Sequence, residues 1–173
     1  IYSDVEPDPD VSTIRRGVEA MRAFQPDVII ALGGGSAIDA AKGMWLFYEH
    51  PEASFDGLRL KFLDIRKRAY KFPRLGEKAK LVAIPTTSGT GSEVTNISIL
   101  NRTRLGTKMG LVGPAMYADA AVLIPQLLEG LPFGVFATSS IDALVHAVES
   151  SLSPKATPYT KLFGYKAIEM LIR

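Results

Sequence analysis

The most informative absence in this 173-residue chain is cysteine. Without a thiol the chain has no disulfide, no thiolate metal ligand and no cysteine nucleophile, which agrees with a reducing, cytoplasmic setting. An excess of one charge is also missing, because 20 Lys and Arg stand against 18 Asp and Glu, a net charge of +2. A chain so nearly neutral has no global field that would select a nucleic acid or an anionic membrane.

Long apolar runs are absent as well. No stretch approaches the roughly 20 apolar residues that cross a bilayer, and residues 1–7 lack the basic and apolar regions of a signal peptide. Hydrophobic residues nevertheless make up 47% of the chain, enough for a buried core. There is no initiator Met, and the chain closes on a helical pattern without a stop signal. We therefore expect an internal segment of a longer protein.

The first helix is predicted over residues 10–24. Asp10 or Ser12 can cap it by accepting hydrogen bonds from its first N–H groups. Apolar residues recur at helical spacing and predict one buried stripe. This stripe consists of Ile14, Val18, Met21 and Phe24. Pro26 ends the helix.

Strands and helices alternate along the next hundred residues. Apolar segments at 28–32, 80–85 and 120–124 predict strands, and a helix is expected over residues 37–48. The first of these strands is apolar without interruption, as a parallel strand covered on both faces would be. The order of elements is typical of an α/β fold with a parallel sheet.

From residue 131 the pattern becomes helical. Pro158 suits the first position of the last helix, with Thr157 before it as the cap. The sequence thus predicts an α/β domain over residues 1–130, followed by the beginning of an all-helical domain over residues 131–173.

Residues 59–80 carry nine basic side chains against two acidic ones. A nucleic-acid patch and a solvated insertion both fit this composition. The balanced net charge and the lack of a nucleic-acid-binding motif favour the insertion.

A glycine-rich turn, Gly33-Gly34-Gly35-Ser36, joins the first predicted strand to the next helix. Without Cβ atoms the backbone can approach a ligand closely, and the N-terminus of a helix favours an anion such as a pyrophosphate. Ser36 can cap this helix. Asp39, in its first turn, can favour the helix dipole or reach a bound ribose or nicotinamide. A tight turn without a ligand explains the glycines as well.

A second turn of this kind follows the strand at 80–85. Residues 86–92 are all Thr, Ser or Gly. Their hydroxyl and N–H groups can line the far side of the same nucleotide, and a plain polar turn explains this composition less well.

Asp142 and His146 are four residues apart in a predicted helix, so their side chains share one face. A carboxylate and an imidazole that converge in this way can be two ligands of a divalent metal, although a solvated polar contact is the alternative. The opposite side is apolar and consists of Ile141, Leu144, Val145 and Val148. The other histidine, His50, lies at a helix end and is assigned no chemistry.

Three motifs stand in order along the chain. They are Gly-Gly-Gly-Ser-x-x-Asp-x-Ala-Lys at 33–42, Pro-Thr-Thr-Ser-Gly-Thr-Gly-Ser-Glu-Val-Thr at 85–95 and Ile-Asp-Ala-Leu-Val-His-Ala-Val-Glu at 141–149. Together they resemble the iron-dependent (group III) alcohol dehydrogenase family. Residues 1–95 resemble the alcohol dehydrogenase half of bifunctional aldehyde–alcohol dehydrogenases, and residues 96–173 resemble 4-hydroxybutyrate dehydrogenases.

The resemblance implies a nucleotide-binding α/β domain followed by an all-helical metal-binding domain, the dehydroquinate synthase-like plan. It implies NAD as the cofactor, with NADP as an alternative. Gly34, Gly35 and Ser36 would hold the pyrophosphate, and Lys108 would meet the nicotinamide ribose. The remaining expected cofactor residues are Asp8 near the adenine side, Asp39, and Thr86, Thr87, Thr90 and Thr95 along the adenosine-to-ribose path.

The resemblance also implies a metal, Fe²⁺ or alternatively Zn²⁺. Asp142 and His146 match the first two ligands of the family, whose other two ligands are histidines further downstream. The metal would act as a Lewis acid on the substrate oxygen while hydride passes to NAD. The expected substrate is a primary alcohol or aldehyde, with 4-hydroxybutyrate and succinate semialdehyde as candidates. A cytoplasmic homo-oligomer is expected, with no nucleic-acid or membrane partner, and this chain alone is expected to be inactive.

Two other functions fit the sequence. A glycerol dehydrogenase-like zinc enzyme would share the same two-domain plan, although the turn at 86–92 and the spacing of Asp142 and His146 favour the iron branch. A non-catalytic nucleotide-binding or assembly fragment would bind a dinucleotide without turnover.

Overall fold

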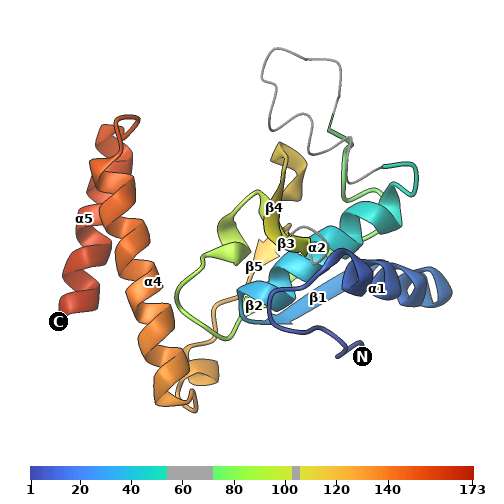
Figure 1. Cartoon of the computed structure of the whole chain (residues 1–173), viewed down its shortest axis with the longest axis horizontal. Helices are drawn as coiled ribbons and strands as arrows, with labels where there is room; N and C mark the ends of the chain where they lie inside the picture. Colours follow the sequence, from blue (N-terminus) through green and yellow to red (C-terminus); the bar gives the residue numbers. More distant parts are fainter. Residues whose placement is uncertain (54–71, 103–105) are drawn as a thin grey trace. The chain divides into compact units, whose positions relative to one another are not determined.

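The computed structural model describes residues 1–53, 72–102 and 106–173, which form two compact units (Figure 1). Unit 1 comprises Ile1–Pro85 and Ser92–Leu123, and unit 2 comprises Thr86–Gly91 and Ile124–Arg173. The change from α/β to helical structure thus falls after Leu123, and the second glycine-rich turn belongs to the helical unit. Most of the basic segment predicted as an insertion lies outside the described residues.

Unit 1 contains a parallel sheet, as predicted. Its strands are β1 (Val28–Gly33), β2 (Lys80–Pro85) and β5 (Ala120–Ala121), in the order β1-β2-β5. β2 pairs in parallel with both neighbours, and β5 is shorter than the sequence indicates. The helix α2 (Gly35–Glu49) connects β1 to β2, which gives the β-α-β unit expected from the sequence.

The helix α1 (Val11–Phe24) begins at an Asp10 cap, whose Oδ1 accepts a hydrogen bond from the Thr13 N–H at 2.9 Å. Ile14 and Val18 are buried as predicted, but Phe24 is 82% exposed. The prediction fails there because Phe24 is the last helical residue. At Gln25 the backbone turns into the left-handed region, with φ of 54°.

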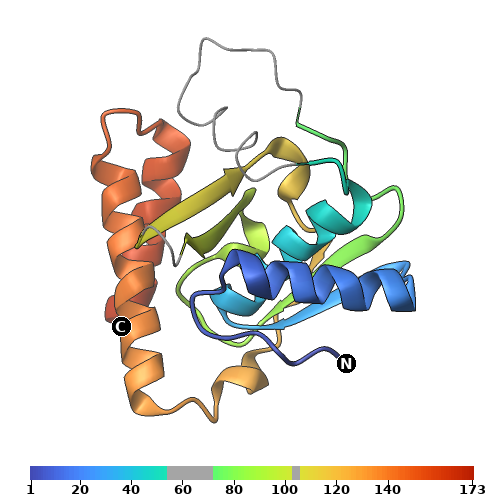
Figure 2. The same ribbon diagram turned by 45° about the vertical axis from the view of Figure 1, so that its right-hand side comes forward.

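Helix α2 is enclosed on several sides. Eleven of its 15 residues are buried. Ile38 and Trp45 pack with Ala31 and Leu81 of the sheet, while Met44 and its neighbours form a second cluster with α1. A helix that is apolar around most of its circumference is stable only when neighbours cover it, and Figure 2 shows α2 (pale blue to cyan) beside α1.

An antiparallel hairpin that the sequence did not indicate completes the second cluster. Its strands are β3 (Ile97–Arg102) and β4 (Thr107–Val112), with Ile97 opposite Val112. Leu100, Met109 and Leu111 point into the core. Ser98 and Gly110 interrupt the apolar residues of the two strands, so neither strand shows a continuous apolar run.

The prediction that the first strand is covered on both faces is wrong for unit 1. Ala31 is buried and Ile29 packs partly against the same cluster, because these side chains face α2. Val28, Ile30 and Leu32 point to the other face and are 47%, 64% and 57% exposed. Successive side chains of a strand alternate between faces, so one cover shields only every second residue.

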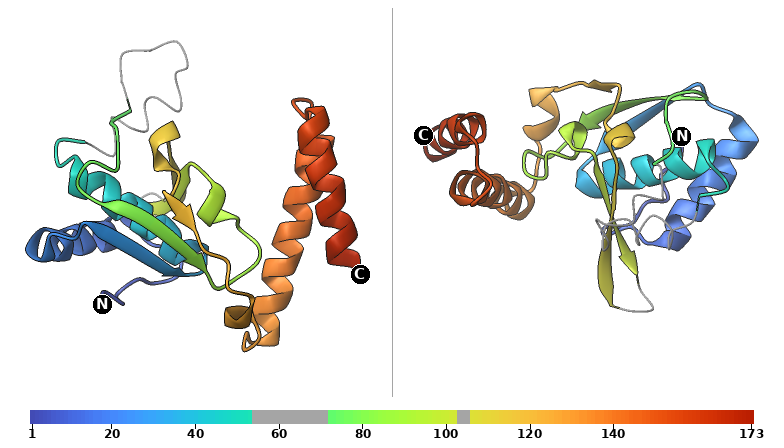
Figure 3. Two further views of the ribbon diagram at one scale, coloured as in Figure 1. Left: turned by 180° about the vertical axis from the view of Figure 1, so that it is seen from behind. Right: turned by 90° about the horizontal axis from the view of Figure 1, so that it is seen from above.

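Unit 2 consists mainly of two helices, α4 (Phe133–Leu152) and α5 (Pro158–Ile172), which lie side by side in both views of Figure 3. Thr157 caps α5 in a capping box, and Pro158 begins it, as predicted. The helices approach closely at Gly164, where a Cβ would lie 2.8 Å from the Ala147 carbonyl oxygen and 2.1 Å from the Ser151 hydroxyl oxygen. Among the described residues, no helix combines the length and apolar character that a membrane span requires.

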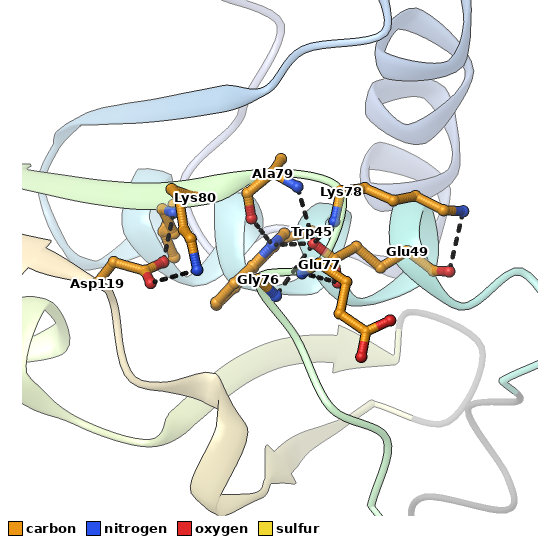
Figure 4. A network of polar contacts seen from close by, with 9 residues as sticks. Trp45, Glu49, Gly76, Glu77, Lys78, Ala79, Lys80 and Asp119 are labelled. Atoms are coloured by element: carbon orange, nitrogen blue, oxygen red, sulfur yellow. Dashed lines mark hydrogen bonds and ion pairs between the residues drawn. The ribbon is translucent and has the colours of Figure 1, made fainter.

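A buried carboxylate joins the end of α2 to the beginning of β2 (Figure 4). Glu49 is only 5% exposed, and its Oε1 accepts hydrogen bonds from the Trp45 indole N–H at 3.0 Å and from the Ala79 backbone N–H at 3.0 Å. The backbone N–H groups of Gly76, Glu77 and Lys78 also donate to Glu49. Burial by itself raises the pKa of this carboxyl, but the donors outweigh burial and hold the pKa below its ordinary value of 4.5.

Replacement of this carboxylate should destabilise unit 1. We expect Glu49→Gln to lower the free energy of unfolding by about 2–3 kcal/mol, because an amide cannot accept all five hydrogen bonds. Urea denaturation would measure the loss, with the exposed Glu19→Gln on α1 as the matched control. Since the folded pKa is depressed, the stabilisation is present above pH 4.5 and disappears as the pH falls through the folded pKa. Equal midpoints for the two variants would contradict the prediction.

Candidate functional site

The N-terminus of α2 lies directly after β1 and is open to a ligand. Gly34 is the N-cap in an extended conformation, and no side chain caps the helix. The prediction that Ser36 caps it is therefore wrong, because Ser36 already lies inside the first turn. Gly33 has φ of +152°, and a Cβ there would lie 2.6 Å from the Ala37 Cβ, so the turn requires glycine. A helix N-terminus without a side-chain cap is a favourable site for an anion.

Asp8 connects this helix end to a lysine from a distant part of the chain. The Asp8 backbone N–H donates to the Ser36 hydroxyl oxygen at 3.2 Å, and the Asp8 carboxylate lies 2.8 Å from the Lys108 ammonium. Asp8 precedes α1, Ser36 lies in α2 and Lys108 in β4. Three of the residues predicted to bind the cofactor thus form one cluster with Gly34 and Gly35 within unit 1.

Asp39, by contrast, faces the interior. It is 7% exposed, its Oδ2 accepts a hydrogen bond from the Ile99 N–H at 3.0 Å, and its carbonyl accepts one from the Ser98 hydroxyl at 2.7 Å. These contacts join α2 to β3. The side chain therefore holds the hairpin against the helix in this structure, rather than pointing toward the uncapped helix end.

Lys42 is a buried polar residue that sequence reasoning left without a role. Its ammonium has no exposed surface and donates to the Thr95 carbonyl, to the Thr95 hydroxyl at 3.2 Å and to the Ile97 carbonyl at 3.0 Å. Thr95, predicted to line the cofactor path, is thus fixed by Lys42. The available signal was a lysine among small and apolar neighbours, Ala40, Ala41, Gly43 and Met44.

Burial and the neighbouring charges shift the pKa values of Asp39 and Lys42 in opposite directions. Burial raises the pKa of Asp39, against the Ile99 N–H, the Lys42 charge and the Ser92 hydroxyl, which lower it. Burial likewise lowers the pKa of Lys42, while the Asp39 and Glu93 carboxylates raise it. Each group thus limits the desolvation penalty of the other.

Removal of the Lys42 charge should destabilise unit 1 strongly. We expect Lys42→Met to lower the free energy of unfolding by about 3–5 kcal/mol, because it removes the positive charge near the buried Asp39 carboxylate and the donor of the Thr95 and Ile97 carbonyls. Lys80→Met is the matched control, since Lys80 is exposed and pairs with Asp119 at 3.4 Å; it should change stability by at most about 1 kcal/mol. Similar urea midpoints for both variants would show that Lys42 is not a structural tie.

The second glycine-rich turn lies in unit 2 and packs on α4. A Cβ at Gly89 would lie 2.5 Å from the Ser139 carbonyl oxygen, so this position requires the absence of a side chain. Thr86 and Thr87 are half-buried, and Thr90 is exposed.

Asp142 and His146 share a face of α4, as predicted. Asp142 Oδ1 and His146 Nε2 are 3.7 Å apart, and both side chains reach solvent. Metal–ligand bonds of about 2.1 Å that meet at a tetrahedral angle separate two ligand atoms by about 3.4 Å, so the pair fits a divalent metal. Among the residues whose structure is described, no three His, Cys, Asp or Glu side chains gather around one such point.

The apolar side of α4 is less buried than its pattern suggests. Ile141 is 61% exposed, and Val145 and Val148 are partly exposed as well. Ala147 and Ser151 instead form the contact with α5, because small side chains let the two helices approach.

Comparison with known proteins identifies the family. Residues 1–125 match the family described as iron-containing alcohol dehydrogenase. The chain is 50% identical over 171 residues to an aldehyde-alcohol dehydrogenase of Streptococcus pneumoniae, an alignment that covers 99% of this chain and 19% of that protein. It is 40% identical over 166 residues to the 4-hydroxybutyrate dehydrogenase of Clostridium kluyveri, covering 95% of this chain and 41% of that protein.

Solved structures agree. An iron-containing alcohol dehydrogenase from Thermococcus thioreducens superimposes with a TM-score of 0.86 at 36% identity, covering 96% of this chain and 43% of that one. A sulfoacetaldehyde reductase from Bifidobacterium kashiwanohense in complex with NAD⁺ gives 0.84 at 27% identity, covering 99% and 43%. The chain thus spans about a fifth of the bifunctional relative and about two fifths of the others.

The chain belongs to the iron-containing alcohol dehydrogenase family. The resemblance inferred from the three motifs is therefore confirmed. The likeness to the bifunctional enzymes and to 4-hydroxybutyrate dehydrogenase each extends over nearly the whole chain, not over one half of it.

Proposed function

We propose that this chain is part of an oxidoreductase that transfers hydride between NAD(H) and a primary alcohol or aldehyde. The observation that carries the proposal is the uncapped N-terminus of α2, where Asp8 contacts both the Ser36 hydroxyl and the Lys108 ammonium beside glycines. Membership of an alcohol dehydrogenase family supports it.

The cradle at α2 suits the pyrophosphate of a dinucleotide. Gly34 and Gly35 put no side chain above the helix end, so the ligand can reach the first N–H groups. The Ser36 hydroxyl oxygen already accepts from the Asp8 N–H, which leaves its own proton for a phosphate oxygen. Lys108 supplies a positive charge and is the candidate partner of the nicotinamide ribose. A solved relative in complex with NAD⁺ supports NAD as the cofactor, and NADP is the alternative.

The threonines have two different roles in this proposal. We propose Thr86, Thr87 and Thr90 as cofactor residues because of their hydroxyl and N–H groups, while Thr95 depends on Lys42 for its position. Asp39 acts through the contacts of α2 with β3, so we assign it a positioning role rather than a direct contact with the cofactor.

Asp142 and His146 are the candidate metal ligands. A bound Fe²⁺ or Zn²⁺ would act as a Lewis acid toward the substrate oxygen. The carboxylate supplies negative charge and the imidazole a neutral nitrogen, a donor set that suits either metal. Because no third candidate ligand gathers beside this pair in the described part of the chain, we expect the 173-residue chain by itself to retain metal weakly and to give no turnover.

We base the proposed substrate on the family likeness, and the proposed setting and assembly on composition. We propose 4-hydroxybutyrate or succinate semialdehyde as substrates because a 4-hydroxybutyrate dehydrogenase is among the similar proteins. A cytoplasmic homo-oligomer fits a chain without cysteine and with a net charge of only +2. A non-catalytic nucleotide-binding fragment remains the second candidate, and it requires dinucleotide binding without metal binding.

Obstruction of the cradle should weaken dinucleotide binding. We expect Gly35→Val to raise the Kd for NADH at least tenfold, because a branched side chain would occupy the space of a phosphate oxygen. Fluorescence titration of NADH measures the affinity, and circular dichroism checks that the fold survives. Gly130→Val is the control, since a Cβ there meets nothing within 4 Å. Unchanged NADH affinity in Gly35→Val would exclude this turn as the phosphate site.

Removal of either candidate ligand should weaken metal binding and leave the affinity for the dinucleotide unchanged. We expect Asp142→Ala and His146→Ala, each placed in a complete parent protein, to weaken Fe²⁺ or Zn²⁺ binding at least tenfold, because each variant removes one protein donor from the metal. Metal content after anaerobic dialysis is the readout, beside NADH affinity. Glu169→Ala on α5 is the control, since this exposed carboxylate lies on the neighbouring helix. Metal retained by both ligand variants would refute the assignment.

A further inference from the structure

Asp8 occupies an unusual backbone conformation at the edge of the proposed cofactor site. Its φ is 54°, in the left-handed region that few residues other than glycine, asparagine and aspartate adopt. The neighbouring backbone holds it there, because the Pro9 carbonyl accepts a hydrogen bond from the Asn101 N–H of β3 at 2.8 Å. This conformation directs the Asp8 N–H to Ser36 and its carboxylate to Lys108.

The ion pair of Asp8 and Lys108 is open to solvent. The two side chains are 61% and 62% exposed, and the carboxylate oxygen lies 2.8 Å from the ammonium nitrogen. Exposed pairs of this kind contribute little to folding stability. Their charges, however, act on any charged ligand that binds beside them. Lys108 is the candidate partner of the nicotinamide ribose, so its ion pair assigns Asp8 to that side of the proposed site and not to the adenine side expected from the sequence.

We propose that Asp8 is a specificity-determining residue that selects the redox form of the dinucleotide by charge. Its carboxylate offsets the Lys108 ammonium, so the site disfavours additional negative charge on the ligand. NADH carries one more negative charge than NAD⁺, because reduction removes the positive charge of the nicotinamide ring. Asp8 therefore weakens NADH binding more than NAD⁺ binding, which favours release of the reduced cofactor. This inference rests on the dinucleotide site proposed above.

The size of the effect follows from Coulomb's law. A unit charge about 7 Å from another in water changes binding by roughly a factor of two to three per unit of ligand charge at low ionic strength. Salt removes most of this effect, because the screening length falls to about 3 Å at 1 M. A structural role of Asp8 would alter both affinities alike, and it would not depend on salt in this way.

The test is a titration of NAD⁺ and NADH with the full chain and its Asp8→Asn variant at low salt. Asparagine also tolerates a positive φ, so this variant keeps the backbone and removes only the charge. Asp8→Gly relieves the same conformation without any side chain and serves as a second variant. Asp4→Asn is the control for the change in net charge. Asp4 lies in the same N-terminal segment as Asp8, but it pairs with Arg16 of α1 at 3.5 Å and not with Lys108 or Ser36.

The expected result is a two- to threefold fall in the ratio of the NADH Kd to the NAD⁺ Kd in Asp8→Asn and Asp8→Gly. The ratio should stay unchanged in Asp4→Asn, and the difference should vanish at about 1 M salt. A ratio equal to that of the wild-type chain, with binding retained and still sensitive to Gly35→Val, would overturn the role of Asp8 alone. If neither form of the cofactor binds the wild-type chain, both this inference and the proposed dinucleotide site fail.

Discussion

The enclosure of helix α2 is the constraint on which the rest of unit 1 depends. Because the sheet covers one side of this helix and α1 with the β3–β4 hairpin covers another, its polar side chains cannot reach water and must find partners inside. Asp39 and Lys42 bind the hairpin, and Glu49 binds the backbone that leads into β2. The polar residues of one helix thus fix the segments around it.

The enclosure of α2 also fixes the position of the proposed cofactor site. A helix held so firmly presents its N-terminus in a fixed place, and glycines keep that end uncovered. The segment before α1 then brings Asp8 to Ser36, and the strand β4 brings Lys108 to Asp8. A charged pair at the rim of an anion site has little effect on stability, but it can adjust which anion binds. Stability and selectivity therefore reside in different residues of one unit.

Unit 2 follows a different principle. Its two helices meet through Gly164, Ala147 and Ser151, and small residues at this contact leave the larger apolar side chains exposed. The pair of Asp142 and His146 needs only the regular turn of α4 to converge. Two ligands on one helix turn are a rigid but incomplete donor set, which is why the proposed chemistry also depends on residues that α4 does not provide.

Patterns between residues close together in the sequence were enough to predict several elements and contacts of this structure. Helical spacing placed Asp142 beside His146, cap chemistry placed Asp10 and Thr157, and apolar runs located β1 and β2. Only the tertiary structure decided which polar groups meet across long separations. Asp8 and Lys108 are 100 residues apart, and Lys42 and Thr95 are 53 apart, so no local pattern relates them. The burial of α2 by a hairpin of mixed polarity decided that Asp39 turns inward, because a buried carboxylate goes where donors are available.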